Sequence, residues 1–400
     1  MFGSAGVDAG RRNFSTSPED MMECPNCSTP HSEAARFCTR CGTPLHPGID
    51  RAQHFAAVPD EPVRALAVMS TLMPHLSAGR QSAYRNAVAL ALLAALLAAA
   101  FGVLSISLVL AAVALPAAVL AYIHDHDVWR DEPITVVGVG FLLSLLLGVA
   151  VGLLENQFTK GVVLVAPAHW PPSGSRILEL GVLVPVVAFV AVLIAPTLIT
   201  ARAAFRHPID ALISCSLSGA ALSLGLSIVV QRGAFTHIDS TAGDPAHVAF
   251  IALTLGFLQP ILFATAAAVT VMRLREATGK PVIGLAQGLT LLVLYELATT
   301  LLEPYGARGI VLTTVAALVL AAAGLIAARN ELHRGLLAEA QEALSGDKAL
   351  AHPAAAEQVC AHCGAAMVPG AAFCQVCGTA SAAMVYEVRP RQLPGGKPVA

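Results

Sequence analysis

The amino-acid sequence predicts an all-α polytopic membrane protein of about eight transmembrane helices, with a small four-cysteine unit near each end. Three observations support this prediction. Of the 400 residues, 56% are hydrophobic and 12% are charged, about half the charged fraction of an ordinary soluble domain. The hydrophobic residues gather in continuous runs that are long enough to cross a bilayer. Eight of the nine cysteines fall in two short segments near the ends of the chain.

The apolar runs define the predicted spans. The run at 86–123 is long enough to cross twice, with a turn near Gly102 to Ser105. The other runs are 133–154, 177–200, 209–230, 246–272, 281–302 and 307–328. The predicted bundle therefore covers 86–328 and holds eight spans, with most charged residues between the runs, because charge is costly to bury in lipid.

Composition assigns the segments outside the bundle. We expect disordered tails at 1–20 and 381–400, cysteine-rich units at 21–45 and 356–380, and a cytosolic helix at 329–350 that continues the last span. Residues 46–85 form a linker. Its stretch 61–77 places five apolar side chains on one helical face: Leu66, Met69, Leu72, Met73 and Leu76. We expect this amphipathic helix to lie on the membrane surface; the alternative is a linker helix with no defined partner.

Both cysteine-rich units have the spacing C-x2-C-x10-C-x2-C, and an offset of 336 residues brings every cysteine of the first onto a cysteine of the second. Each C-x2-C turn places two sulfurs on one side of a loop, so two facing turns make a tetrahedral four-thiolate site. Gly42 and Gly378 follow where the turn favours positive φ. We expect two structural zinc ions, with no open position for catalysis. The predicted ligands are Cys24, Cys27, Cys38, Cys41, Cys360, Cys363, Cys374 and Cys377.

The two units resemble the short zinc-ribbon domains found at the ends of many bacterial proteins, with the pattern CPxCG…FCxxCG. The resemblance covers about 20 residues at each end and implies an interaction or stabilising module. We expect His31 and His362, inside the units, to be surface residues. Because the units carry few basic residues and the net charge is −2, we expect no nucleic-acid partner.

The distribution of Lys and Arg predicts the orientation. With the N-terminus inside, the inner loops and flanks carry eleven of these residues and the outer loops carry four, in agreement with the positive-inside rule. Eight spans return the C-terminus to the same side, and zinc thiolates need a reducing compartment. We therefore expect a multi-pass protein of the bacterial cytoplasmic membrane with both termini in the cytosol. We also expect its two cysteine-rich units to pack as a pair.

Residues 121–148 (AYIHDHDVWRDEPITVVGVGFLLSLLLG) resemble the loop and span that follow two transmembrane helices in the PrsW-type intramembrane proteases. The resemblance implies an acidic pair in one later span and a histidine in another. This chain has Ala188-Phe189 and Gln259-Pro260 at those places, so the resemblance implies a relative that has lost catalysis. His124 and His126 in the loop are candidates for a metal site, although a solvated loop is the simpler interpretation.

Glu296 is the best candidate for a functional side chain within a span, because an acid at that depth is costly unless it is paired or hydrated. We expect Gln259 or Gln287 as its partner, or a role in ion or proton passage. Three functions remain open. The first is a non-enzymatic scaffold or regulatory protein with lipid around its spans and a protein partner at its ribbons. The others are a PrsW-like protease or a catalytically lost relative, and a transporter or channel-like protein that uses Glu296. We favour the first.

Overall fold

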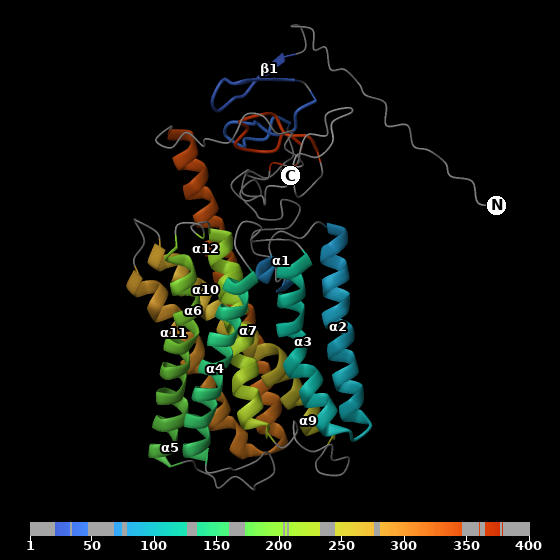
Figure 1. Cartoon of the computed structure of the whole chain (residues 1–400), viewed down its shortest axis with the longest axis vertical. Coiled ribbons are helices and arrows are strands. Elements are labelled where there is room, and N and C mark those ends of the chain that lie inside the picture. Colours follow the sequence, from blue (N-terminus) through green and yellow to red (C-terminus); the bar gives the residue numbers. More distant parts are fainter. Residues whose placement is uncertain are drawn as a thin grey trace, which may run out of the picture.

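The structure is a computed structural model in which a long bundle of helices carries the cysteine-rich segments at one end (Figure 1). Both tails and much of the 46–85 linker lie outside the residues that the structure describes. The described residues are 21–32, 34–46, 68–73, 78–125, 134–159, 173–202, 205, 208–232, 245–275, 281–345, 360, 365–376 and 378.

The described part of the chain contains eight helices long and apolar enough to cross a membrane. This confirms the predicted all-α core with eight long apolar helices. The long elements are α2 (Ala78–Ala100), α3 (Leu104–Asp125), α4 (Ile134–Thr159), α6 (Val184–Thr200), α7 (Pro208–Val230), α10 (Gln259–Arg275), α11 (Pro281–Leu302) and α12 (Ala307–Ser345). Shorter helices are α1 (Val68–Leu72), α5 (Gly174–Leu178), α9 (Pro245–Leu253) and η6 (Glu303–Tyr305), and two π-helical turns are η3 (Glu179–Leu183) and η5 (Thr254–Leu258).

The first apolar run forms two membrane-length helices, as predicted, because a glycine turn divides it. Gly102 has φ +77°, and its N–H donates to the carbonyl of Ala99 at 2.9 Å while the Val103 N–H donates to the carbonyl of Ala98 at 2.8 Å. These two bonds form a Schellman motif, which ends a helix by turning the chain through a left-handed residue. Helix α2 therefore ends at Ala100 and α3 returns beside it.

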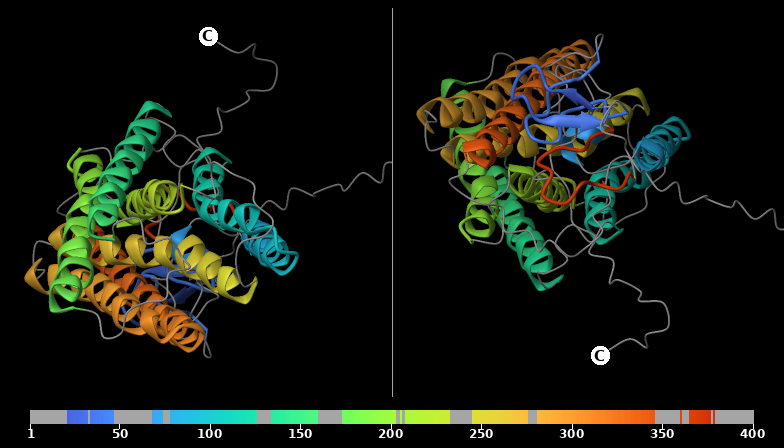
Figure 2. Two further views of the ribbon diagram at one scale, coloured as in Figure 1. Left: turned by 90° about the horizontal axis from the view of Figure 1, so that it is seen from below. Right: turned by 90° about the horizontal axis from the view of Figure 1, so that it is seen from above.

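Helix α7 lies at the centre of the bundle, where α4 and α10 pack closely against it (Figure 2). Glycines allow this approach. A Cβ at Gly148 of α4 would meet the carbonyl oxygen of Leu222, and one at Gly225 of α7 would meet the carbonyl oxygen of Leu145. The glycines of α7 therefore allow close helix packing.

A short chain of hydroxyl groups crosses the same interface. The Ser144 hydroxyl donates to the Ser218 hydroxyl at 3.0 Å, which in turn donates to the carbonyl of Val192 on α6 at 2.9 Å. Three helices are thus joined by two buried hydrogen bonds, and neither serine leaves its polar atom without a partner in an apolar setting.

Each π-helical turn contains a glycine against which a neighbouring helix packs. In η3, a Cβ at Gly181 would lie 2.6 Å from a methyl carbon of Leu297 on α11. In η5, a Cβ at Gly256 would clash with Ala111 on α3. The turns join α5 to α6 and α9 to α10 without a break, so that each of these pairs forms one span.

The predicted amphipathic helix at 61–77 is described only at 68–73, and this part differs in position from its expectation. Among the described residues it is the five-residue helix α1, which contacts α2, α7 and α12. Met69, Leu72 and Met73 are buried in the same apolar cluster as the bundle core, whereas Leu66 and Leu76 lie outside the described residues. Its apolar face is therefore covered by protein, and the surface-helix prediction is wrong for this part.

Helix α12 continues past the last span, as the sequence predicts. Its 39 residues make a helix of about 58 Å at 1.5 Å per residue, so it rises above the bundle toward the cysteine-rich segments (Figure 1). Near this end, Glu331 is buried and accepts from Arg273 at 2.8 Å and from Arg334 at 2.9 Å. Gly284 of α11 leaves room for the stem of Arg273, since a Cβ there would lie 2.6 Å from the Arg273 Cβ.

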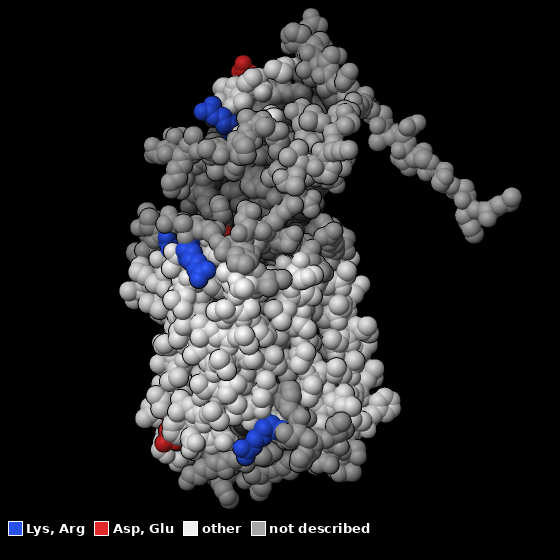
Figure 3. Space-filling view, viewed as in Figure 1, with Lys and Arg blue, Asp and Glu red and all other residues white. Residues whose placement is uncertain are grey.

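The described charges gather toward the two ends of the bundle, and the face in between is uncharged (Figure 3). Large apolar side chains such as Leu90, Leu146 and Val190 are exposed in the middle parts of their spans. An apolar band of this kind is what contact with lipid requires.

Candidate metal centre

A short antiparallel hairpin opens the first cysteine-rich segment. Strand β1 (Met21–Glu23) pairs with β2 (Pro30–Ser32), and Met22 lies opposite His31. The hairpin positions the turn 24–29, which carries the first two cysteines.

The two cysteine turns share one backbone geometry. In the first, the Cys24 N–H donates to the carbonyl of Thr29 at 3.0 Å and the Ser28 N–H donates to the carbonyl of Cys24 at 2.9 Å. The second turn, 38–43, repeats both bonds at 2.8 and 2.9 Å. Each turn has one residue with positive φ, +53° at Ser28 and +67° at Gly42, which confirms the role predicted for that glycine.

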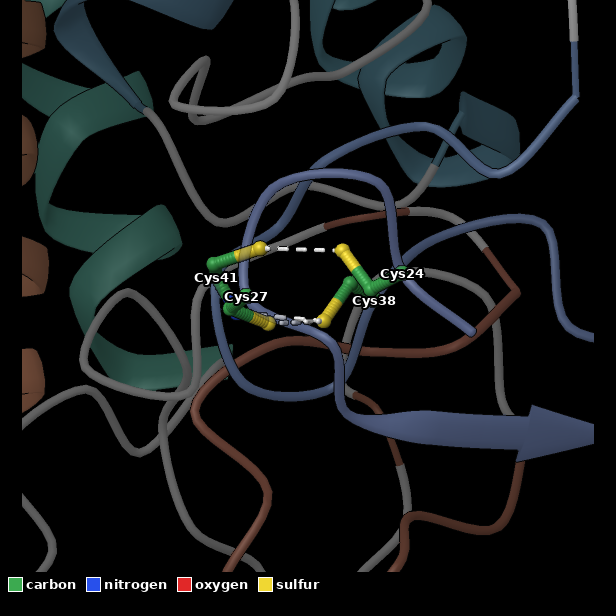
Figure 4. Close-up of side chains that lie close together, drawn as sticks. All are labelled: Cys24, Cys27, Cys38 and Cys41. Carbon is green, nitrogen blue, oxygen red and sulfur yellow. Dashed lines mark hydrogen bonds between the residues drawn. The ribbon is translucent and has the colours of Figure 1, made fainter. Parts of the chain in front are cut away.

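These turns bring four sulfurs together (Figure 4). All four Sγ atoms lie within 4.8 Å of one another. The Cys24–Cys41 and Cys27–Cys38 sulfur pairs are each 3.5 Å apart. A disulfide would need about 2.05 Å, whereas four sulfurs at about 2.3 Å from a zinc ion are about 3.8 Å apart in a tetrahedron. The cluster therefore fits a structural zinc ion bound by four thiolates.

Neighbouring polar groups make contacts to three of the sulfurs. The hydroxyl groups of Thr29 and Thr43 lie 3.1 Å from the sulfurs of Cys27 and Cys41. The Nε2 atom of His31 lies 3.1 Å from the sulfur of Cys38. In each case an O–H or N–H can donate to a thiolate, which orients the ligand and favours its charged form.

Burial and these contacts shift the pKa values of the side chains at the site. Burial raises the pKa of Cys38, and burial lowers the pKa of His31. At Cys41, burial also raises the pKa, but hydrogen bonds from Thr43, Cys38 and Cys27 together outweigh it, so the pKa falls to about 6. A zinc ion held by the four sulfurs would supply positive charge that favours their thiolate forms.

Comparison with known proteins agrees with this geometry. Residues 24–45 match the family of zinc-ribbon domains. No curated protein and no solved structure matches the chain. The N-terminal segment is therefore a zinc ribbon in sequence and in the placement of its ligands. The resemblance to PrsW-type proteases receives no support from these comparisons.

The second cysteine-rich segment repeats part of the ribbon's backbone. Three hydrogen bonds of the ribbon recur 336 residues later, with donor and acceptor at Cys360 and Ala365, Ala371 and Val368, and Gly378 and Cys374. Cys360 and Cys374 are buried, and Met367 occupies the position that corresponds to His31. Two predicted ligands, Cys363 and Cys377, lie outside the described residues, as does His362.

The two segments contact each other through paired backbone bonds. The Phe37 N–H donates to the carbonyl of Gln375 at 3.1 Å, and the Phe373 N–H donates to the carbonyl of Thr39 at 3.0 Å. Phe37 corresponds to Phe373 and Thr39 to Gln375 under the 336-residue offset. The contact is thus nearly two-fold symmetric, and it agrees with the prediction that the cysteine-rich segments meet.

Side chains repeat the same symmetry. A Cβ at Gly42 would lie 3.0 Å from the ring of Phe373, and one at Gly378 would lie 2.9 Å from the ring of Phe37. Both phenylalanines are buried. The glycine that follows each last cysteine is therefore covered by an aromatic ring from the other segment.

The predicted functional residues of the bundle do not form a comparable site. Glu296 is half-buried on α11, and its carboxylate accepts from Thr299 of the same helix at 3.3 Å. Its expected partners lie elsewhere: Gln259 accepts from Ser223 at 3.3 Å, and Gln287 is exposed. Within the described residues, the four ribbon cysteines form the one group of three or more close metal-ligating side chains.

The loop candidates and the family landmarks add no second site to the bundle. His124 is exposed at the end of α3, and His126 lies outside the described residues. Ala188 and Phe189, at the place of the family's acidic pair, are buried apolar residues of α6.

Sequence reasoning missed the residues around the sulfurs. His31 is buried and lies against Cys38, so the expectation of a surface histidine is wrong. Thr29 and Thr43 were not predicted to have any role. A signal for the two threonines is present in the sequence, because each stands two residues after the last cysteine of its turn.

Proposed function

We propose that this chain is a non-enzymatic integral membrane protein of the bacterial cytoplasmic membrane, with two cytosolic zinc ribbons that act together as an interaction or regulatory module. The observation that carries the proposal is the symmetric contact between the two cysteine-rich segments at one end of the bundle. A module built from both ends of the chain presents a single surface to a protein partner.

A second zinc ion in residues 360–377 is part of this proposal. The recurring backbone bonds and the burial of Cys360 and Cys374 support it. Cys363 and Cys377 complete the ligand set by their spacing, which is the same as in the first ribbon. As in that ribbon, four protein sulfurs would fill the coordination sphere and leave no place for a substrate or a reacting water.

The orientation with both ribbons in the cytosol rests on charge. Among the described residues, Arg202, Arg273 and Arg334 lie toward the ribbon end of the bundle, whereas Arg176 and Arg308 lie toward the opposite end. The cytosol is also the compartment in which free thiolates persist.

Metal counting tests the proposal. The purified, reduced full-length protein is expected to contain two zinc ions, and the double variant Cys360→Ser/Cys374→Ser is expected to contain one. Cys215→Ser is the matched control, because Cys215 is buried in α7 and belongs to no cysteine cluster. One zinc in the wild-type protein would overturn the second site and the paired module.

A further inference from the structure

We infer that the two ribbons bind zinc cooperatively, so that each ribbon holds its zinc more tightly when it is in contact with the other. We call this contact, formed by Phe37 and Gly42 with Phe373 and Gly378, the clasp. This inference rests on the proposed second zinc site. It adds a property that neither ribbon has alone: the zinc affinity of one ribbon depends on whether the other ribbon is folded around its zinc.

The symmetry of the contact supplies the first step. In an isologous interface the same patch is used twice, so residue i contacts j and residue j contacts i. Here Phe37 covers Gly378 and Phe373 covers Gly42. One aromatic ring therefore stands on each side of the interface, and removal of either ring leaves a defect in both ribbons.

The second step is the position of the contact relative to the ligands. Gly42 follows Cys41 directly and has φ +67°, a conformation in which its N–H bonds back to the carbonyl of Cys38. The ring of Phe373 lies against this glycine. The partner segment therefore packs on the turn that fixes two of the four sulfurs.

The backbone hydrogen bonds between the two segments also end on the turns that carry the cysteines. Thr39, whose carbonyl accepts from Phe373, lies between Cys38 and Cys41 in the sequence. Gln375, whose carbonyl accepts from Phe37, lies at the corresponding place between Cys374 and Cys377. Each ligand turn therefore has one carbonyl fixed by the other segment, which restricts the motion that would open the metal site.

The clasp also touches the bundle. Phe373 belongs to the same buried apolar cluster as Met69, Leu72 and Met73, and that cluster continues into the helix core. The view along the bundle axis places the blue strands and the red segment over the end of the helices (Figure 2, right). Release of the clasp would therefore uncover apolar side chains at this end of the bundle.

The test measures the protection of each cysteine in the full-length zinc protein, by the rate of alkylation with N-ethylmaleimide and mass spectrometry of the peptides. Phe373→Leu alters the C-terminal segment but is expected to raise the alkylation rate of the N-terminal cysteines, 24, 27, 38 and 41. An increase of about 5- to 150-fold is the range of ordinary coupling between sites. Phe37→Leu should have the reciprocal effect on the C-terminal cysteines.

Two control variants separate this effect from local damage. Val376→Ala changes an exposed side chain in the same segment and should leave the N-terminal cysteines at their wild-type rate. Gly370→Ala and Gly378→Ala both place a Cβ at positive φ, but only Gly378 faces a ring of the other ribbon. The N-terminal cysteines should therefore respond to Gly378→Ala and not to Gly370→Ala.

Cys215 serves as an internal standard, because it is buried in α7 and should remain unreactive in every variant whose bundle is folded. The inference is overturned if Phe373→Leu leaves the N-terminal cysteines protected while Cys215 stays unreactive. That result would show that the two ribbons bind zinc independently. The zinc count would still be two, so the alkylation experiment tests the clasp and the zinc count tests the proposed module.

Discussion

At the scale of single residues, the contacts of the sulfurs explain how a segment of 22 residues can hold a metal. The N-terminal ribbon is too small to bury a core of its own, so zinc binding supplies its folding free energy, about 10–16 kcal/mol in small zinc peptides. The hydroxyls of Thr29 and Thr43 and the imidazole of His31 add to this by contacting the ligands.

His31→Ala is expected to weaken zinc binding at the N-terminal ribbon about 10- to 100-fold, the usual effect of removing a group that supports a metal ligand. The cause is loss of the 3.1 Å contact between His31 Nε2 and the sulfur of Cys38. Competition with a chromogenic chelator measures the affinity. His46→Ala is the control, since His46 lies one residue beyond the matched segment, and equal affinities in the two variants would contradict the prediction.

The spacing of the cysteines was sufficient to predict the ligands of the first ribbon, because the spacing itself sets the geometry of the turns. It could not predict His31. The pairing of β1 with β2 directs this side chain inward, opposite Met22, and the pattern of a three-residue strand is too short to read in the sequence. Met367 at the corresponding place shows that the ribbon backbone does not require histidine there.

At the scale of elements, small residues decide how closely the central helices approach. Gly148, Gly219 and Gly225 each face backbone of a neighbouring helix. In lipid there is no hydrophobic driving force between helices, so close backbone contact and hydroxyl hydrogen bonds supply the association. The most buried helix, α7, is accordingly the richest in serine.

Gly148→Ala is expected to destabilise the bundle by about 1–3 kcal/mol, the usual cost of overpacking a tight interface. The new methyl group would meet the carbonyl of Leu222, and backbone yields less readily than a side chain. The thermal unfolding midpoint in detergent reports the loss. Gly138→Ala, in the same helix with open space around it, should not lower the midpoint, because alanine is the better helix former; a similar fall in both variants would contradict the packing explanation.

The spans and the glycine turn at Gly102 followed from hydrophobic length alone. The position of α1 did not. Helical periodicity shows that Met69, Leu72 and Met73 share a face, but it is the same whether lipid or protein covers that face. The end of the bundle offers enough apolar surface to bury them, and that surface is assembled from helices far apart in the sequence.

At the scale of the whole molecule, the eight long helices bring the two cysteine-rich segments to the same end of the bundle. The last helix then carries the chain beyond the bundle, with its Glu331 held by Arg273 and Arg334. Some of the arginines counted toward the orientation are therefore also structural, since Arg273 has a buried acid as its partner.

A labelling experiment checks the proposed orientation. Arg308→Cys and Arg202→Cys each replace an exposed arginine, at the far end and at the ribbon end of the bundle. In intact bacterial cells, a membrane-impermeant maleimide is expected to label the Arg308→Cys protein, and to label the Arg202→Cys protein only after lysis. The opposite pattern would place the ribbons outside the cytosol.

The meeting of the two ends also has a consequence for the synthesis of the protein. The first ribbon leaves the ribosome 336 residues before its counterpart, which at 5–20 residues per second is a wait of roughly 15 to 70 s. During this time the surface around Phe37 has no partner from its own chain. Because an odd number of inserted helices would leave the two segments on opposite sides of the membrane, the contact cannot form in a chain in which one of the eight helices has failed to insert. The final step of assembly therefore depends on an even number of insertions before it.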